Sequence, residues 1–189
     1  MKRTFDVTTA FLPTPCVLVA CGDGDAANII TLAWAGVVNS KPPMIGVSMR
    51  KEAHSYALIK EHNEFTVNIP HQSILRETDI CGVVSGAHTD KFAYARLTKQ
   101  ASRKVRAPII GEAIISLECE VRQISELGSH TLFIGEVLEV HVDEKILDPN
   151  GRVNIDRIKP FVYCPLIHEY RSIGDKLGKF GFSKGKISD

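Results

Sequence analysis

The sequence predicts a mainly β protein with a few short helices, folded as a closed or nearly closed antiparallel β-barrel. Two observations lead to this prediction. Short apolar or alternating segments, typical of strands, follow one another at close spacing along most of the chain, whereas only two segments have helical spacing. No internal repeat or low-complexity linker marks a second domain, so residues 1–189 are expected to form a single domain.

The first three predicted strands lie in the N-terminal quarter. CVLVA, residues 16–20, and IITLAWAGVV, residues 29–38, flank the sequence GDGD, which favours a hairpin turn. Pro42 and Pro43 end the second strand, and MIGVSM, residues 44–49, forms the third.

Two short helices are predicted next. The first lies within KEAHSYALIKEHN, residues 51–63, and it precedes a strand at FTVNI, residues 65–69. The second is SILRETDICGVV, residues 73–84, with Ser73 as its N-cap and Gly86 soon after its end.

Two long strands dominate the second half. In SLECEVRQI, Leu117, Cys119 and Val121 alternate with polar residues, which predicts a strand buried on one face. After the turn ELGSH, TLFIGEVLEVHVDE, residues 131–144, has an apolar face on which Glu136 is the only polar member. The segment Leu147 to Lys159 is expected to be an excursion from the barrel.

Composition excludes several classes of protein. A formal net charge of +1 provides no global field for nucleic acid or an anionic membrane. The C-terminal lysines, including Lys184 and Lys186, have few aromatic neighbours, so nucleic-acid binding is not expected. The N-terminus lacks the apolar core of a signal peptide and no segment is long and apolar enough to span a membrane, so we expect a soluble, cytoplasmic protein.

The spacing of the cysteines and histidines does not indicate a metal site. The five cysteines are odd in number and form no C-x-x-C pair, which argues against a disulfide framework or a zinc site and favours buried free thiols. The histidines likewise form no H-E-x-x-H or H-x-H motif. The sequence therefore predicts no metal ligands.

The segment GVSMRKEAHSY contains the densest group of polar residues. Ser48 and Arg50 share a face at the end of a strand, and His54 and Ser55 stand where the next helix begins. A guanidinium, hydroxyls and free helix N–H groups together suit a phosphate. Spacing alone also allows a simpler interpretation, in which Arg50 is a solvated charge and Ser55 only caps the helix.

Motifs distributed along most of the chain resemble the flavin reductase-like family, the FMN-binding split barrels, and especially its flavoredoxin branch. The opening Pro, the N-x-x-T-x-[AS]-W strand, the P-P break, the S-x-R strand and the His-Ser helix start all occur in order. They correspond here to Pro15, Asn28, Thr31, Ala33, Trp34, Pro42, Pro43, Ser48, Arg50, His54 and Ser55. VSGAHTDKF and GSHTLFIGEV resemble two later motifs of the family, and the resemblance extends from about Thr8 to Gly185.

This resemblance implies an FMN-binding split β-barrel with FMN as cofactor. Arg50, Ser48 and Ser55 would hold the phosphate with Lys91 as a second cation, and the Asn28–Trp34 segment would run beside the flavin ring. The cofactor-binding residues that it implies are Asn28, Thr31, Leu32, Ala33, Trp34, Ser48, Met49, Arg50, His54, Ser55, Ser85, Gly86, Lys91 and Tyr170. For His54, ligand contact and a purely structural role at the helix start are both open.

The implied activity is that of an NAD(P)H-dependent flavin reductase, with NADH or NADPH as co-substrate. His130 would lie near the reactive edge of the flavin as the catalytic residue, although an ordinary exposed histidine is the alternative. No G-x-G-x-x-G follows a strand, so the nucleotide would bind without a Rossmann unit. Two other functions remain open: a flavoredoxin-type electron carrier reduced by a protein partner, and a non-redox flavin-binding module. The family also implies a homodimer.

Overall fold

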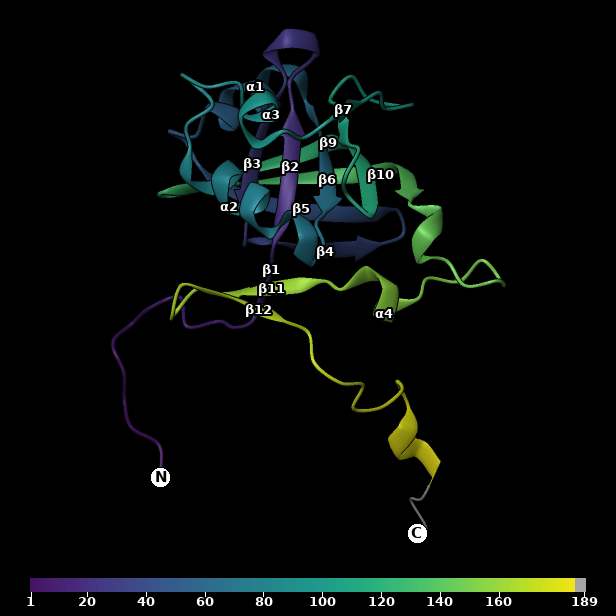
Figure 1. Ribbon diagram of the computed structural model, residues 1–189. Helices are drawn as coiled ribbons and strands as arrows, with labels where there is room; N and C mark the ends of the chain where they lie inside the picture. The colour runs from purple at the N-terminus through teal and green to yellow at the C-terminus, as the bar shows by residue number, and fades with distance from the viewer. Residues whose placement is uncertain (186–189) are drawn as a thin grey trace.

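Seven antiparallel strands form the main sheet in a computed structural model, which describes residues 1–185 (Figure 1). Lys186 of the predicted basic tail lies outside the described residues. The strand order across the sheet is β3 (Asn28–Leu32), β2 (Val17–Cys21), β6 (Glu64–Ile69), β9 (Ile115–Leu127), β10 (His130–Val142), β5 (Pro43–Arg50) and β4 (Ala35–Ser40). This arrangement confirms the predicted antiparallel β architecture.

The sheet curls into a nearly closed barrel because its two outermost strands are consecutive in the chain. β3 pairs only with β2 and β4 only with β5, so the single strand predicted over residues 29–38 is wrong. The chain bends at Ala33 and Trp34 instead. The Ser48 N–H donates to the Trp34 carbonyl at 2.8 Å, which ties this bend to β5.

Helices pack against two faces of the sheet: α1 (His54–His62) against the cluster inside the barrel, and α2 (Leu75–Val83) and α3 (Lys91–Ala95) against the outward face of β2. α1 begins at the predicted histidine and ends at Asn63, whose positive φ of 55° closes the helix. The second predicted helix is divided into a 3-10 turn, η2 (Gln72–Ile74), and α2, and α3 follows. Ser73 is therefore not the N-cap of α2: it lies inside η2, where its N–H donates to the His71 ring.

β2 is buried on both faces and so separates two apolar clusters. Val17, Val19 and Cys21 pack inside the barrel, whereas Leu18 and Ala20 pack outward against α2 and α3. All five cysteines are buried and free, as the sequence indicated.

The long hairpin of β9 and β10 departs from the predicted pattern of burial. Cys119 packs in the barrel core as expected, but Glu118 on the opposite face is also fully buried, because the loop from Gln100 to Ile110 covers it. In β10 the fully buried residues are Thr131, Phe133 and Gly135, not the apolar residues of the other parity. Register shifts after Ile134 and Val137 explain why one parity does not describe the whole strand.

The remaining elements are short. β1 (Thr14–Pro15), β11 (Phe161–Cys164) and β12 (Glu169–Ser172) form a small sheet beside the barrel, and β7 (Lys99–Gln100) pairs with β8 (Ile109–Ile110). Both chain ends extend away from the small sheet (Figure 1). The segment from Leu147 to Lys159, predicted to be an excursion, contains a β-bridge between Leu147 and Val153 and the short helix α4 (Ile155–Ile158). Single 3-10 turns occur at η1 (Gly24–Ala26), η3 (Glu144–Ile146) and η4 (Phe182–Gly185).

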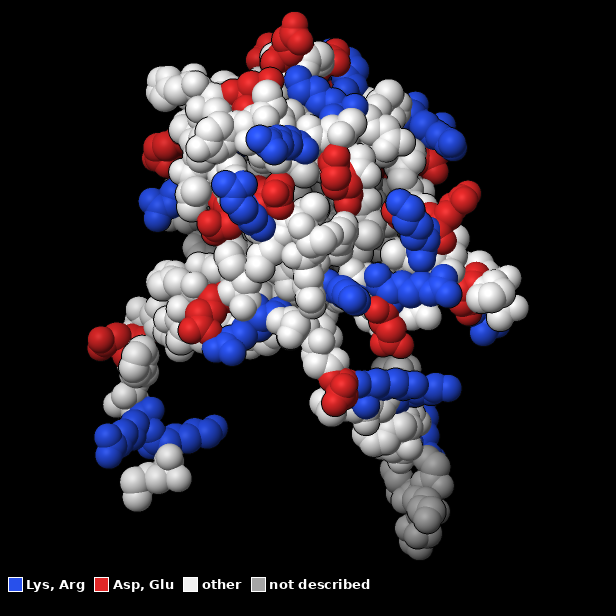
Figure 2. All heavy atoms as spheres, in the orientation of Figure 1, with Lys and Arg blue, Asp and Glu red and all other residues white. Residues whose placement is uncertain are grey.

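Charges of both signs are interspersed over the visible surface (Figure 2). Within residues 1–185, no helix combines the length and the apolar character required to cross a bilayer.

Candidate functional site

Three adjoining cavities lie around β3, between the barrel, α2 and the small sheet. The large cavity, of about 550 Å³, includes Trp34, Ser48, Arg50, His130 and Tyr163 in its lining. The lysine cavity, of about 240 Å³, includes Asn28, Ser55, Ser85 and Lys91, and the tyrosine cavity, of about 400 Å³, includes Asp79 and Tyr170. Ile30, Glu52 and Ala53 line both the large and the lysine cavities, which are therefore contiguous.

Strand pairing brings the polar residues of the large cavity together. His130 lies directly opposite Arg50 in the β10–β5 pair. Its ring packs against Trp34 of the β3–β4 bend, with the ring centroids 4.3 Å apart and the planes tilted by 42°. Ser129 Oγ lies 2.9 Å from His130 Nδ1. Partial burial, together with the positive charge of Arg50, lowers the pKa of His130 below its ordinary value of 6.5. This shift favours the neutral imidazole at pH 7.

The lysine cavity contains a buried cation. Lys91, at the start of α3, is only 4% exposed, and its ammonium group donates to the Cys81 carbonyl at 2.8 Å. Burial lowers the pKa of Lys91, and among the described residues no carboxylate forms an ion pair with it. A buried ammonium group without a counter-charge is costly unless a ligand supplies one.

A hydrogen bond fixes the other wall of the lysine cavity. Asn28 Nδ2 donates to Ser55 Oγ at 2.8 Å, and both side chains are buried. Ser55 is therefore not the helix cap; the residue at that position is Ala53. Gly86 leaves room for this pair, because a Cβ at residue 86 would lie 2.2 Å from Asn28 Oδ1. These contacts place Asn28, Ser55 and Gly86 side by side in the wall of the lysine cavity.

The tyrosine cavity joins the C-terminal sheet to α2. The Tyr170 hydroxyl donates to Asp79 Oδ1 at 2.9 Å, and its ring packs against Phe161 and Tyr163. Burial, followed by the bond to Asp79, raises the pKa of Tyr170 well above its ordinary range. Thr31 and Ala33 line this cavity as well as the large one.

All fifteen predicted cofactor and catalytic residues thus line three connected cavities. They are not gathered around one shared anion site, as the sequence suggested for four of them. Ser48 and Arg50 line the large cavity, whereas His54 and Ser55 line the lysine cavity. Sequence reasoning missed Thr9, Glu52, Tyr163, Pro165 and His168, which also line the large cavity. Of these, Glu52 alone could have been noticed, because it falls between Arg50 and His54 in the polar segment.

Comparison with known sequences identifies the family. The sequence model of the flavin reductase-like domain matches residues 9–174, which is most of the chain. The chain belongs to the flavin reductase-like family. This family consists of flavin-binding oxidoreductases, and its split-barrel fold is the one observed here.

Individual members of the flavin reductase-like family agree with this assignment. The solved structure of flavoredoxin from Desulfovibrio vulgaris (Miyazaki F) is 38% identical, with a TM-score of 0.90 over 98% of this chain and 100% of that one. A flavoredoxin from Methanosarcina acetivorans is 27% identical, with a TM-score of 0.89 over 98% of both chains. An NADPH-flavin oxidoreductase from Streptomyces viridifaciens is 28% identical over 69% of this chain and 68% of its own length.

The cavities fit a flavin in shape and in charge. A flavin nucleotide has a flat, mostly apolar ring at one end and a phosphate at the other. The large cavity presents apolar groups such as Ile30, Leu32 and Trp34, and the contiguous lysine cavity presents a buried cation and hydroxyl groups. Flat cofactors are commonly held in this way, in apolar clefts with few placed polar groups.

Proposed function

We propose that the chain binds FMN, with the ring in the large cavity and the phosphate in the lysine cavity. The single observation that carries this proposal is the buried ammonium group of Lys91, which has no carboxylate partner among the described residues. A phosphate would supply the missing negative charge and would accept hydrogen bonds from Lys91, Ser55 and Ser85. His54, at the start of α1, adds a polar group to the same cavity.

The remaining predicted residues would act on the other parts of the cofactor. Ser48 and Arg50 would reach it from the large cavity, and the backbone from Thr31 to Trp34 would lie along the ring. Met49 and Tyr170 are proposed to contact it through packing. We propose that the whole chain is one FMN-binding domain.

We further propose that the protein is an NAD(P)H-dependent flavin reductase. Bound FMN would supply the hydride and electron chemistry, so no side chain is required as a nucleophile. The lowered pKa of His130 favours a neutral imidazole, which packs against Trp34 and would position a nicotinamide or the ring edge. Arg50, opposite His130, would stabilise negative charge that develops nearby. The apolar lining would exclude water.

A flavoredoxin-type electron carrier, reduced by a protein partner, is the second candidate. Two observations favour it: the similarity to the Desulfovibrio flavoredoxin, which extends over 98% of the chain, and the lack of a Rossmann motif in the sequence. This function uses the same cofactor site and differs only in the donor.

A cytoplasmic homodimer is the proposed state of the protein. The outermost strand β4 exposes Val37 and Val38 next to the partly exposed Trp34, and such apolar edges are commonly covered by a second copy. Five free cysteines suit a reducing compartment.

Anaerobic absorbance spectra test the proposed function. The protein loaded with FMN is expected to be yellow and to bleach when NADH or NADPH is added. If it stays yellow until dithionite is added, the electron carrier replaces the reductase. If no FMN binds, the cofactor assignment itself is wrong.

A further inference from the structure

We propose that the chain has a second ligand site, for a small organic monocarboxylate, at the end of β10 that is remote from the large cavity. A separate cavity of about 380 Å³ lies there, between the β7–β8 hairpin and the ends of β9 and β10. Its lining includes Gln100, Arg103, Ser116, Val140, His141 and Asp143. We call it the polar cavity.

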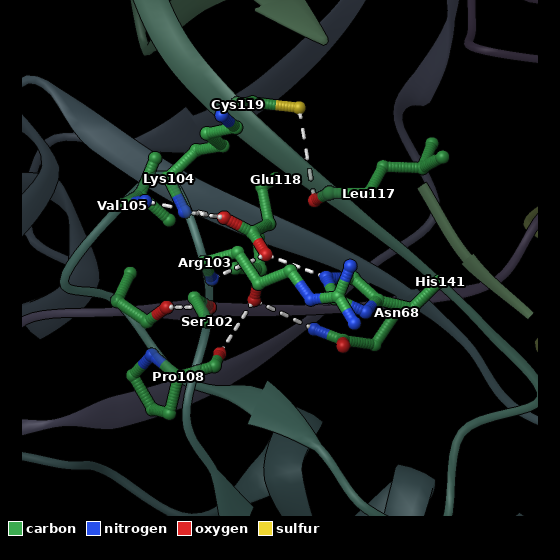
Figure 3. A network of polar contacts seen from close by, with 12 residues as sticks. Asn68, Ser102, Arg103, Lys104, Val105, Pro108, Leu117, Glu118, Cys119 and His141 are labelled. Atoms are coloured by element: carbon green, nitrogen blue, oxygen red, sulfur yellow. Dashed lines mark hydrogen bonds and ion pairs between the residues drawn. The ribbon is translucent and has the colours of Figure 1, made fainter. Parts of the chain in front are cut away.

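One wall of the polar cavity is held by a buried carboxylate (Figure 3). Glu118 accepts hydrogen bonds from the backbone N–H groups of Arg103, Lys104 and Val105 at 2.8, 2.6 and 3.1 Å. It also accepts from His141 Nε2 at 2.5 Å. These bonds fix the backbone of the loop that carries Arg103. The backbone of this surface loop is therefore held in place, while the Arg103 side chain itself is exposed.

The polar cavity contains donors that have no partner. Ser116 is only 3% exposed and lines the cavity, yet its hydroxyl makes no hydrogen bond within residues 1–185. The Arg103 guanidinium forms no ion pair with any described residue, and it extends toward His141 in Figure 3. Thr131 Oγ1 is the one fully enclosed polar side-chain atom without a partner in the described residues, so the Ser116 hydroxyl opens to the cavity, where a ligand or water can complete its hydrogen bonding.

The two nearby carboxylates, in contrast, already accept hydrogen bonds from the protein. Every hydrogen bond that Glu118 accepts is donated by one of the protein groups named above. Asp143 Oδ1 accepts from the Lys145 N–H at 2.9 Å, and its Oδ2 lies 4.0 Å from the Lys145 ammonium group. Because Arg103 and Ser116 are hydrogen-bond donors, a ligand that bonds to them must bring acceptor oxygens of its own.

These features favour a monocarboxylate with a short apolar body. The planar guanidinium of Arg103 matches the two oxygens of a carboxylate, and Ser116 can donate a further hydrogen bond. Val140 and Val142 supply an apolar part of the lining, which is otherwise mainly polar. The negative charge of Asp143 on the rim disfavours ligands with a second negative charge.

The polar cavity is independent of the proposed flavin site. His130 and His141 lie eleven residues apart on β10, which corresponds to about 35 Å along an extended strand. Occupation of one site therefore does not require occupation of the other.

Calorimetric titration of the full-length protein with sodium butyrate tests the proposal, with ionic strength held constant by NaCl. We expect saturable binding of one butyrate per chain. Arg103→Ala, which leaves the backbone bond to Glu118 intact, should weaken it at least tenfold, and Arg103→Lys should weaken it less. Ser116→Ala should weaken it severalfold. Lys104→Ala is the matched control: it is exposed, lies in the same loop and does not line the cavity, so affinity should be unchanged.

Three results would overturn the proposal. The first is that the native protein shows no saturable binding of butyrate. The second is that Lys104→Ala weakens binding as much as Arg103→Ala, which would indicate a general charge effect. The third is that inorganic phosphate binds while butyrate does not.

Discussion

Two buried charges, Glu118 in β9 and Lys91 at the start of α3, differ in the partners that surround them. Glu118 is completely buried, and its carboxylate is surrounded by three backbone N–H groups and the His141 ring. Lys91 is buried almost as fully, but its one described partner is a carbonyl oxygen, that of Cys81. Glu118 is thus satisfied by the protein alone, whereas Lys91 lacks a counter-charge.

The difference separates a structural charge from a functional one. A protein can bury a carboxylate to fix a loop if it supplies enough donors. A buried cation beside an open cavity, without a carboxylate, indicates instead that a ligand completes the site. On this basis we propose that Glu118 stabilises the fold and that Lys91 binds the FMN phosphate.

The largest expected effect concerns Glu118. Glu118→Ala leaves three backbone donors without a partner and should lower the free energy of unfolding by about 3–5 kcal/mol. Urea denaturation measures this change. Glu61→Ala, at an exposed position of α1, is the control and should change stability by less than about 0.5 kcal/mol. If the two variants are equally stable, Glu118 does not have the assigned role.

The same carboxylate predicts a dependence on pH. Burial alone would raise the pKa of Glu118, but hydrogen bonds from the Arg103 N–H, His141, and the Lys104 and Val105 N–H groups lower it below the ordinary 4.5. A lowered pKa in the folded state contributes stability above pH 4.5, which is lost as the pH falls through the folded value. Acid unfolding of the native protein should therefore steepen below pH 4.5.

A substitution at Gly86 tests the wall of the lysine cavity, where the ligand is proposed to bind. Gly86→Ala would bring a Cβ against Asn28 and displace its side chain from Ser55, at a cost of about 1–3 kcal/mol. FMN affinity should fall as well. Gly36→Ala is the matched control, because a Cβ there meets no atom within 4 Å. A variant Gly86→Ala with native stability and native FMN affinity would contradict this description of the cavity wall.

Thr131 offers a smaller test of how the fold treats buried polar groups. Its hydroxyl is buried in β10 without a hydrogen-bond partner among the described residues. Thr131→Val keeps the shape and removes this atom, so thermal unfolding should show stabilisation of about 1 kcal/mol. Thr66→Val should do the opposite, because the Thr66 hydroxyl donates to the Pro108 carbonyl at 2.7 Å. Destabilisation by Thr131→Val would indicate a partner that the described contacts lack.

The smallest effect is a shift at His130. Arg50→Gln removes the positive charge that, after burial, lowers the pKa of His130, so that pKa should rise toward 6.5. NMR titration of the imidazole measures it. Lys51→Gln is the control, since Lys51 pairs with Glu126. An unchanged His130 pKa in Arg50→Gln would show that the two side chains do not interact.

Part of the cavity lining could be predicted from the sequence, because several of its residues are close together in the chain. Ser48 and Arg50 at the end of β5, and His54 and Ser55 at the start of α1, could be placed by periodicity and by the resemblance to the family. The break at Trp34 was not visible, because pairing with two different strands, not local sequence, ends β3. Tyr163 and His168 were missed because only the tertiary fold brings the small sheet to the cavity.

The most direct test of the central claim is the affinity of the protein for FMN compared with riboflavin, which lacks the phosphate. Both should be measured for the native chain, for Lys91→Met and for the exposed control Lys99→Met. We expect Lys91→Met to weaken FMN binding by about 10- to 100-fold, the range for a lost charge-assisted hydrogen bond. Its riboflavin affinity and the stability of the flavin-free protein should not decrease. Equal loss of FMN and riboflavin binding, or no loss of either, would contradict the assignment of Lys91 to the phosphate.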